Sequence, residues 1–260
     1  MKWLPAARGI GGIVLFLALW EATVRFGWLQ YEYLPAPSVI LSGLVTLGAG
    51  TEVYGELAHT ISATLEGWAM AVVLGLILGV LLGLSATVRA YSLTTIEVLR
   101  PVPAIALVPI ALLLFGFSLK TELFVIVLPC TWPVLINTMA GIQSVPPRLR
   151  DVAEVLHLGR HATVTKVLVP AAATGVLVGC RLSISLAIVL AIISEMIGNP
   201  HGLGNAIIRE SEALRPDLMF AYIFITGLLG IVLNACLVQV AKLLLPGEFM
   251  RPAAAMRGLQ

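Results

Sequence analysis

The chain has 260 residues, of which 59% are hydrophobic and 12% are charged, and its formal net charge is +2. An ordinary soluble domain carries about 25% charged residues. A soluble fold of this length could not bury so much apolar surface, so the composition excludes that class and indicates a chain that lies in a lipid bilayer. Nothing in it indicates a nucleic-acid partner.

Long uncharged runs indicate which kind of structure crosses the bilayer. The segments 67–88, 123–147 and 218–241 contain no charged residue, and each is longer than the roughly 20 residues that a helix needs to cross the hydrocarbon core. A backbone in lipid must satisfy its own hydrogen bonds, which helices do, whereas strands of a membrane barrel would alternate polar and apolar residues. The sequence therefore predicts an all-α integral membrane protein.

In chain order, we predict six transmembrane helices within a single domain, 1–260. They lie at about 9–27, 61–86, 102–117, 121–141, 168–197 and 218–245. The first resembles the start of a signal peptide, but Glu21 and Arg25 follow where a cleavage site would need small residues, so we expect this helix to be retained. The third is interrupted by Pro101, Pro103 and Pro109, which membrane helices tolerate where neighbouring groups bond the freed carbonyls.

Two shorter helices are expected on the outer side. Ser38 follows two prolines and is available to cap a helix along the membrane interface, within the segment 1–60 that also holds the first span. The second, over 205–214, follows the Gly- and Pro-containing loop 198–204. The remaining parts are the core helices at 61–245, a cytoplasmic insert at 144–169 and a cytoplasmic tail at 246–260.

The basic residues are distributed unequally over the two sides of this topology. With the N-terminus inside, four lie outside: Arg25, Lys120, Arg209 and Arg215. Eleven lie inside: Lys2, Arg8, Arg89, Arg100, Arg148, Arg150, Arg160, Lys166, Lys242, Arg251 and Arg257. Cytoplasmic loops carry the excess of Lys and Arg in membrane proteins, so we expect both termini and the segment 144–167 in the cytoplasm.

The segment 144–167 is a polar interruption between the fourth and fifth spans. Residues 148–166 can form one or two short amphipathic helices, whose apolar set is Val152, Val155, Leu156 and Leu158. Two interpretations stay open on the residues alone. The segment is either a basic loop that fixes topology and meets anionic lipid, or a surface that a protein outside the bilayer recognises.

Arg181 lies roughly 14 residues into the fifth span, near the middle of the bilayer. An arginine there costs about 2.5–3.5 kcal/mol on insertion scales and should face the protein interior or a water-filled path. It either lines the path of a small anion, or has a structural role in which it bonds carbonyls of a neighbouring helix or packs at a dimer interface. Its partner could be Glu195, about 21 Å further along the helix, or Glu66, or a polar group of another helix. The candidate path residues are Thr131, Asn137, Arg181, Ser185 and Glu195, although Ser and Thr also commonly join membrane helices.

Other patterns indicate packing rather than chemistry. Gly75, Gly79 and Gly83 recur every fourth residue, which is typical of closely packed membrane helices. His157 and His161 could share a helix face, but no third ligand accompanies them, and the three cysteines match no metal or redox spacing. No nucleophile and base present themselves together, so we expect no catalytic, cofactor-binding or metal site in this chain.

The polar insert also fits the spacing of a known pattern. Permease subunits of bacterial ABC importers carry Glu-Ala-Ala, three residues, Gly, nine residues, then Ile-x-Leu-Pro. This chain reads Asp151-Val152-Ala153, then His157, then Val167-Leu168-Val169-Pro170 at the same spacing. Because His157 replaces the glycine that permits a sharp turn, we expect Gly159 to provide that turn.

Further landmarks extend the resemblance to nearly the whole chain. They include Leu34-Pro-Ala-Pro-Ser38, Arg100-Pro-Val-Pro-Ala-Ile-Ala-Leu-Val-Pro109, Trp132-Pro-Val-Leu-Ile-Asn-Thr138 and Gly202-Leu-Gly204. Their order and spacing resemble the aliphatic-sulfonate, taurine and nitrate branch of ABC-importer permeases.

The resemblance implies a transport subunit rather than an enzyme. The insert would be a coupling helix docked on an ATPase, through Arg148, Arg150, Asp151, Ala153, Glu154, His157, Gly159, Arg160 and Pro170. The chain would act in the bacterial cytoplasmic membrane as a homodimer with two ATPases and an extracytoplasmic solute-binding protein. ATP and Mg would be bound by those ATPases, since the chain has no Gly-Lys dipeptide and so no Walker A loop.

The cargo expected from the resemblance is a small anion of the nitrate, sulfonate or taurine class, moved by alternating access. Two alternatives stay open. One is an ATP-independent channel or secondary carrier, and the other is a permease of the same class that imports bicarbonate or a vitamin or heterocycle precursor.

Overall fold

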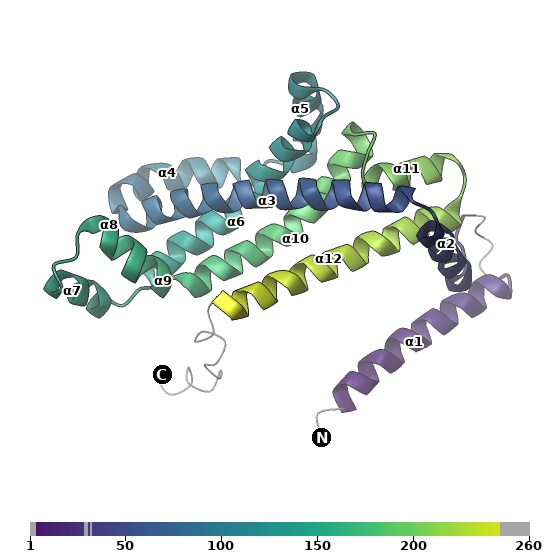
Figure 1. The fold of residues 1–260 in the computed structure, drawn as a ribbon, viewed down its shortest axis with the longest axis horizontal. Helices are drawn as coiled ribbons and strands as arrows, with labels where there is room; N and C mark the ends of the chain where they lie inside the picture. Colours follow the sequence, from purple (N-terminus) through teal and green to yellow (C-terminus); the bar gives the residue numbers. More distant parts are fainter. Residues whose placement is uncertain (1–3, 29–30, 32, 245–260) are drawn as a thin grey trace.

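The computed structural model describes residues 4–28, 31 and 33–244, and helices dominate this part of the chain (Figure 1). In order, the α-helices are α1 Leu4–Arg25, α2 Pro37–Ala49, α3 Glu52–Leu84, α4 Ala86–Leu99, α5 Val108–Phe115, α6 Leu119–Gln143, α7 Pro147–Val155, α8 Arg160–Thr163, α9 Val169–Ala171, α10 Ala173–Gly198, α11 Leu203–Glu212 and α12 Pro216–Leu244. A 3-10 turn, η1 (Ala104–Leu107), precedes α5, and a π turn, η2 (Val164–Leu168), follows α8. The predicted all-α class is confirmed, and the predicted tail 246–260 lies outside the described residues.

Four of the described helices are long and apolar enough to cross a membrane: α3, α6, α10 and α12. A fifth span is possible if α4 and the segment 104–115 count as one, although they are bent by 84°. The predicted first span corresponds to α1, which has 22 residues. The count of six spans therefore stays a prediction, while the multi-pass character is confirmed.

The third predicted span, 102–117, is the one that the structure corrects. It is a broken pair in which α4 begins directly after α3, where Ser85 caps it by accepting a hydrogen bond from the Val88 amide at 3.3 Å. The chain then bends at Pro101 and Pro103, because a proline has no amide hydrogen and disfavours helix in the residue before it. Residues 86–99, between the second and third predicted spans, form helix α4.

A row of glycines holds α3 against α6. A Cβ atom added to Gly75 would lie 2.6 Å from Cβ of Val134, and one added to Gly79 would lie 2.6 Å from Cβ of Thr138. Close contacts of the same kind occur between Gly67 and Ile126 and between Gly83 and Ile142. The glycines of α3 and the residues that they contact on α6 therefore recur at the same intervals along the two helices. The close packing predicted from Gly75, Gly79 and Gly83 is confirmed.

Helix α10 completes the core by packing on both α3 and α6. Trp68 Nε1 donates to the Cys180 carbonyl at 3.1 Å, which joins α3 to α10. Ser183 Oγ donates to the Cys130 carbonyl at 2.9 Å, which joins α10 to α6. Buried apolar residues of all three helices meet around these contacts, so the three helices form one packed slab.

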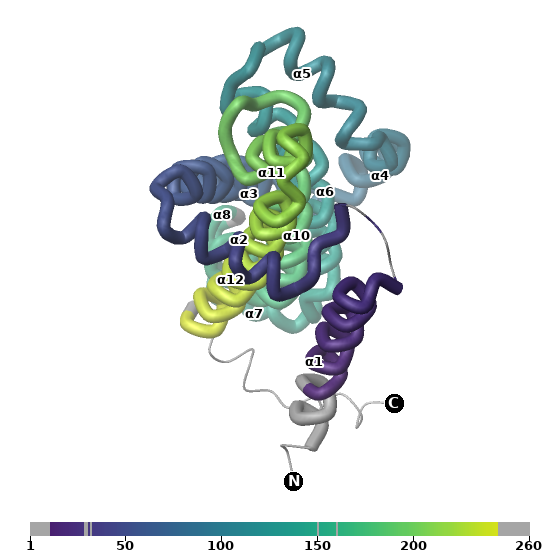
Figure 2. Tube along the Cα trace, turned by 90° about the vertical axis from the view of Figure 1, so that its right-hand side faces the viewer, coloured from purple at the N-terminus to yellow at the C-terminus, as the bar shows by residue number. Residues whose placement is uncertain are grey.

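The two ends of the slab carry different connections. The insert with α7 and α8 lies at one end, and α2 and α11 lie at the other (Figure 1). Figure 2 shows α2 crossing that second end, with α1 standing apart from the slab. Among the described residues, α1 contacts α2, and it also reaches α12 through Trp20 and Phe220, whose ring centroids are 6.4 Å apart.

Helix α2 begins differently from the prediction. Its N-cap is Ala36, with Pro37 in the first turn, so Ser38 lies inside the helix. The exposed amide of Ser38 instead donates to Glu21 Oε2 at 2.9 Å, and its hydroxyl donates to Glu21 Oε1 at 2.8 Å. A carboxylate is favourable at a helix N-terminus, and here a neighbouring helix, α1, supplies it.

Candidate functional site

The segment 144–169, predicted as a cytoplasmic insert, contains two short helices, α7 and α8, that project from one end of the slab (Figure 1). Val145 and Leu168, which flank the insert, are buried with Ile142 and Ala172 in one apolar cluster. Within α7, Ala153 is 2% exposed and faces the rest of the protein. The insert is thus fixed to the ends of α6 and α10 at both of its junctions.

The turn between α7 and α8 is made by His157, which has a positive φ of 49°. The Leu158 amide donates to the Ala153 carbonyl at 3.0 Å, and the His157 amide donates to the Glu154 carbonyl at 2.9 Å. These two bonds define a Schellman motif, whose left-handed residue is usually glycine. The prediction that Gly159 provides the turn was wrong. The left-handed residue is at position 157, where the importer pattern has glycine and this chain has histidine.

The outward face of the insert is apolar. Val155 is 77% exposed and Leu156 is 63% exposed, and Leu149 and Val152 are exposed as well. Of the predicted apolar set, only Leu158 is half-buried. An exposed apolar face on an otherwise polar segment is typical of a surface that binds another protein or a membrane.

Polar groups of the predicted coupling set surround this face. Arg148, Asp151, Glu154 and Gly159 are exposed. Arg150 and Arg160 belong to α7 and α8, but their side chains lie outside the described part. Pro170 lies in α9, at the junction with α10.

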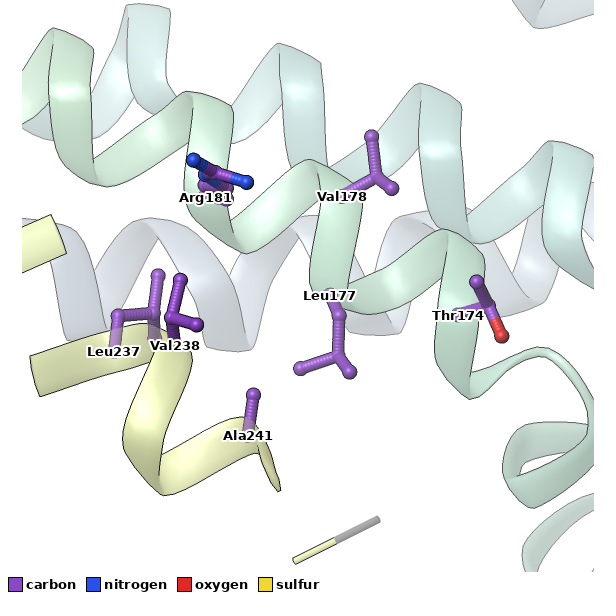
Figure 3. Close-up of a pocket in the computed structure, with 7 residues that line it drawn as sticks. All are labelled: Thr174, Leu177, Val178, Arg181, Leu237, Val238 and Ala241. Atoms are coloured by element: carbon purple, nitrogen blue, oxygen red, sulfur yellow. The ribbon is translucent and has the colours of Figure 1, made fainter. Parts of the chain in front are cut away.

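Arg181 is exposed on α10 and lines a small open cavity between α10 and α12 (Figure 3). The cavity has a volume of about 190 Å³, and its lining is mostly apolar: Thr174, Leu177, Val178, Arg181, Leu237, Val238 and Ala241. Arg181 is the charged group in it. Ser185 lies one turn further along α10, and its hydroxyl donates to the Arg181 carbonyl at 3.2 Å.

The partner of the Arg181 side chain is Asn234 on α12, since Arg181 Nε donates to Asn234 Oδ1 at 3.2 Å. Neither Glu195 nor Glu66, the two acidic candidates, makes this contact in the described residues. The sequence offered one signal for Asn234: it is a polar residue in the otherwise apolar run 227–238. The general alternative, a polar group of another helix, was correct.

The other candidate path residues lie elsewhere. Thr131 Oγ1 donates to the Val127 carbonyl at 2.7 Å, and Asn137 Nδ2 donates to the Pro133 carbonyl at 2.8 Å, so both satisfy carbonyls of α6. Glu195 is fully buried near the opposite end of α10, where its Oε2 accepts a hydrogen bond from the Gly204 amide at 2.8 Å. The structure therefore groups none of the other four candidates with the Arg181 side chain, since Ser185 bonds only the Arg181 backbone carbonyl.

Several membrane-length helices, with an arginine between two of them and an exposed apolar face at one end, define a multi-pass helical membrane protein. Residues 71–248 match the family of binding-protein-dependent transport system inner membrane components, and the chain belongs to this family.

Named relatives cover most of the chain. SsuC of Bacillus subtilis, named as an aliphatic sulfonates transport permease protein, is 32% identical over 83% of this chain and 78% of its own length. NrtB of Leptolyngbya laminosa, a nitrate import permease protein, is 32% identical over 77% of this chain and 73% of its own. TauC of Escherichia coli, a taurine transport system permease protein, is 27% identical over 95% and 93%.

A solved structure has the same fold. A chain of the inward-facing MetNI methionine ABC transporter matches with a TM-score of 0.65 at 16% identity, covering 74% of this chain and 95% of that one. The protein is therefore an ABC-importer permease, on the branch that contains SsuC, NrtB and TauC.

Proposed function

We propose that this chain is the membrane-spanning subunit of an ATP-driven importer of a small anion, with the segment 144–169 as its coupling surface. Two copies of the chain would pair with two ATPases and receive the solute from a binding protein on the outer side. The ATPases would bind ATP and Mg and perform the hydrolysis. The two bundles would then alternate between inward- and outward-open arrangements.

The observation that carries the docking proposal is the exposed apolar face of Leu149, Val152, Val155 and Leu156. Water solvates these side chains poorly, and burying one fully contributes about 1.5–3 kcal/mol. A helix that presents its apolar face to a groove is a recurrent mode of protein recognition. Asp151 and Glu154 beside the face would give the contact its orientation.

The anionic cargo is supported by Arg181 and by the names of three relatives. An arginine in a mostly apolar cavity creates a positive field that favours an anion. SsuC, NrtB and TauC are named for aliphatic sulfonates, nitrate and taurine.

A second candidate cargo is a small heterocycle. ThiX of Halalkalibacterium halodurans, a formylaminopyrimidine transport permease protein, is 28% identical over 90% of this chain and 92% of its own length. Calorimetry on the cognate binding protein, with sulfonates, nitrate, taurine and a pyrimidine as ligands, would separate the two candidates.

A charge reversal tests the docking proposal. Asp151→Lys should reduce co-purification of the ATPase by about tenfold or more, because a like charge placed in a protein contact costs several kcal/mol. The matched control is Glu212→Lys, the same charge change on an exposed residue at the opposite end of the slab. It should leave the ATPase bound. Equal ATPase recovery with both variants would rule out the proposed docking surface.

A further inference from the structure

Three ionisable side chains from three different helices meet at the outer end of the slab. They are His59 of α3, Glu122 of α6 and Glu195 of α10, and one potential ligand atom from each lies within 4.8 Å of the others. Both carboxylates are fully buried, while the imidazole is partly exposed. Sequence reasoning assigned these residues to separate segments and did not bring them together.

The hydrogen bonds within this cluster leave part of its charge unmatched. His59 Nε2 lies 2.9 Å from Glu122 Oε1, and the Gly204 amide donates to Glu195 Oε2 at 2.8 Å. Asn199 Nδ2 also donates to Glu122 Oε1. The second oxygen of each carboxylate, Glu122 Oε2 and Glu195 Oε1, is buried without a hydrogen-bond partner among the described residues.

The Thr60 hydroxyl lies beside Glu195, but it is shared with other groups. The Thr60 hydroxyl, on the next residue of α3, donates to the Glu56 carbonyl at 3.1 Å and accepts from the Leu203 amide at 2.9 Å. Burying an ionised carboxylate costs several kcal/mol unless an opposite charge compensates it. One histidine supplies at most one positive charge to two carboxylates, so the cluster has room for an additional cation.

The cluster is connected to the outer surface. His59 lines a hollow of about 500 Å³ whose other lining residues are Glu52, Gly55, Glu56, His201 and Arg209. Two of these are acidic, and Glu56 is paired with Arg209, whose Nη1 lies 3.2 Å from Glu56 Oε1. The ring centroids of His59 and His201 are 5.8 Å apart. His59 therefore belongs both to this hollow and to the cluster, so a cation in the hollow would meet the imidazole first.

We propose that His59, Glu122 and Glu195 bind a divalent metal ion of the zinc or manganese class. One imidazole nitrogen and two carboxylate oxygens are a donor set that zinc accepts, and carboxylates with an imidazole also suit manganese. The ion would lie beside the two carboxylate oxygens that have no hydrogen-bond donor among the described residues. It would thereby join α3, α6 and α10 at the outer end. This inference does not depend on the transport proposal.

Metal analysis of the full-length chain tests it. The protein is purified without a histidine tag, stripped with a chelator, incubated separately with Zn²⁺ and Mn²⁺, freed of unbound ion and measured by mass spectrometry. The wild type should retain one of the two metals stoichiometrically, and that metal should raise its midpoint of thermal unfolding. Glu122→Gln and Glu195→Gln, which preserve shape, should each lose the metal and the shift.

The insert offers a matched control, because His157 and His161 are the chain's other closely spaced histidines. The double variant His157→Ala, His161→Ala should keep the metal. Retention in Glu195→Gln together with loss in this double variant would place the ion on the insert and overturn the proposal. Failure of the wild type to retain either metal would also overturn it, whether or not the Gln variants fold.

Discussion

Within the described residues, three helix ends close with the same pair of hydrogen bonds, and one of the three uses glycine. The left-handed residue is Gly27 after α1, His157 after α7 and Leu214 after α11, with φ values of 69°, 49° and 56°. In each case the next amide bonds back five residues and the left-handed residue's own amide bonds back three. A residue with a Cβ atom adopts this conformation at a cost of about 1–2 kcal/mol.

Glycine at the two costly positions should therefore stabilise the protein. We expect His157→Gly and Leu214→Gly each to contribute about 0.5–1 kcal/mol, since glycine removes the Cβ clash but loses more backbone entropy on folding. Gly27→Ala should have the opposite effect. The midpoint of thermal unfolding in detergent measures all three. A lower midpoint for His157→Gly would mean that the imidazole itself contributes more than the turn costs.

At the scale of elements, the contact between α3 and α6 depends on the absence of side chains. Gly79→Ala would place a methyl group 2.6 Å from Cβ of Thr138 and 2.8 Å from the Leu135 carbonyl, neither of which can rotate away. Overpacking of this kind typically costs about 1–3 kcal/mol. The control is Gly227→Ala on α12, where no atom lies within 4 Å of the new methyl group, and where alanine favours helix by up to about 1 kcal/mol.

The unfolding midpoints of these two variants check the argument. Gly79→Ala should lower the midpoint, and Gly227→Ala should leave it unchanged or raise it. If both variants behave alike, the glycine row is not what brings α3 and α6 together.

The boundaries of the predicted helices show which sequence signals were sufficient. For α6 and α12, runs of apolar residues ended near charges, and the predicted limits fall close to Leu119–Gln143 and Pro216–Leu244. For α3 the prediction began nine residues late, at 61 instead of Glu52. The omitted residues include Glu56 and His59, which fell in the outer segment before the second predicted span. In the fold they face the hollow between α3 and α11 instead of forming a connection.

The candidate site could be predicted only where a pattern of neighbouring residues in the sequence indicated it. The position and helical character of the insert followed from residues 144–170 alone. The contact of Arg181 with Asn234, and the cluster of His59 with Glu122 and Glu195, join helices that are far apart in sequence. A single sequence records no such pairing, because it depends on how the helices pack.

At the scale of the whole molecule, Arg181 connects two helices that otherwise pack loosely. Helix α12 is mostly exposed, and the cavity beside Arg181 lies between it and α10. We expect Arg181→Gln to reduce uptake of the cognate solute by about tenfold or more, since losing about 1.4 kcal/mol of stabilisation slows a step tenfold. Arg181→Lys should retain more uptake than Arg181→Gln, because it keeps the charge. Uptake by cells that express equal amounts of each variant measures this.

Asn234→Ala separates the two roles of the arginine. It removes the hydrogen bond but not the charge, so uptake should stay close to the wild type if Arg181 acts through its field. A loss as large as that of Arg181→Gln would instead indicate that the contact between α10 and α12 is what matters.

The close backbone packing of α3, α6 and α10 has a mechanical consequence. Gly175 and Gly179 of α10 approach carbonyls of Asn137 and Pro133 on α6, with added Cβ atoms 2.8 and 2.9 Å away. The glycine row of α3 holds that helix equally close to α6. Three helices in such close contact are expected to move together, and under the proposed coupling role the insert between α6 and α10 would transmit that movement. A force on the insert at Val155 would then displace α3, α6 and α10 together. The loosely packed contact between α10 and α12 would change as they move.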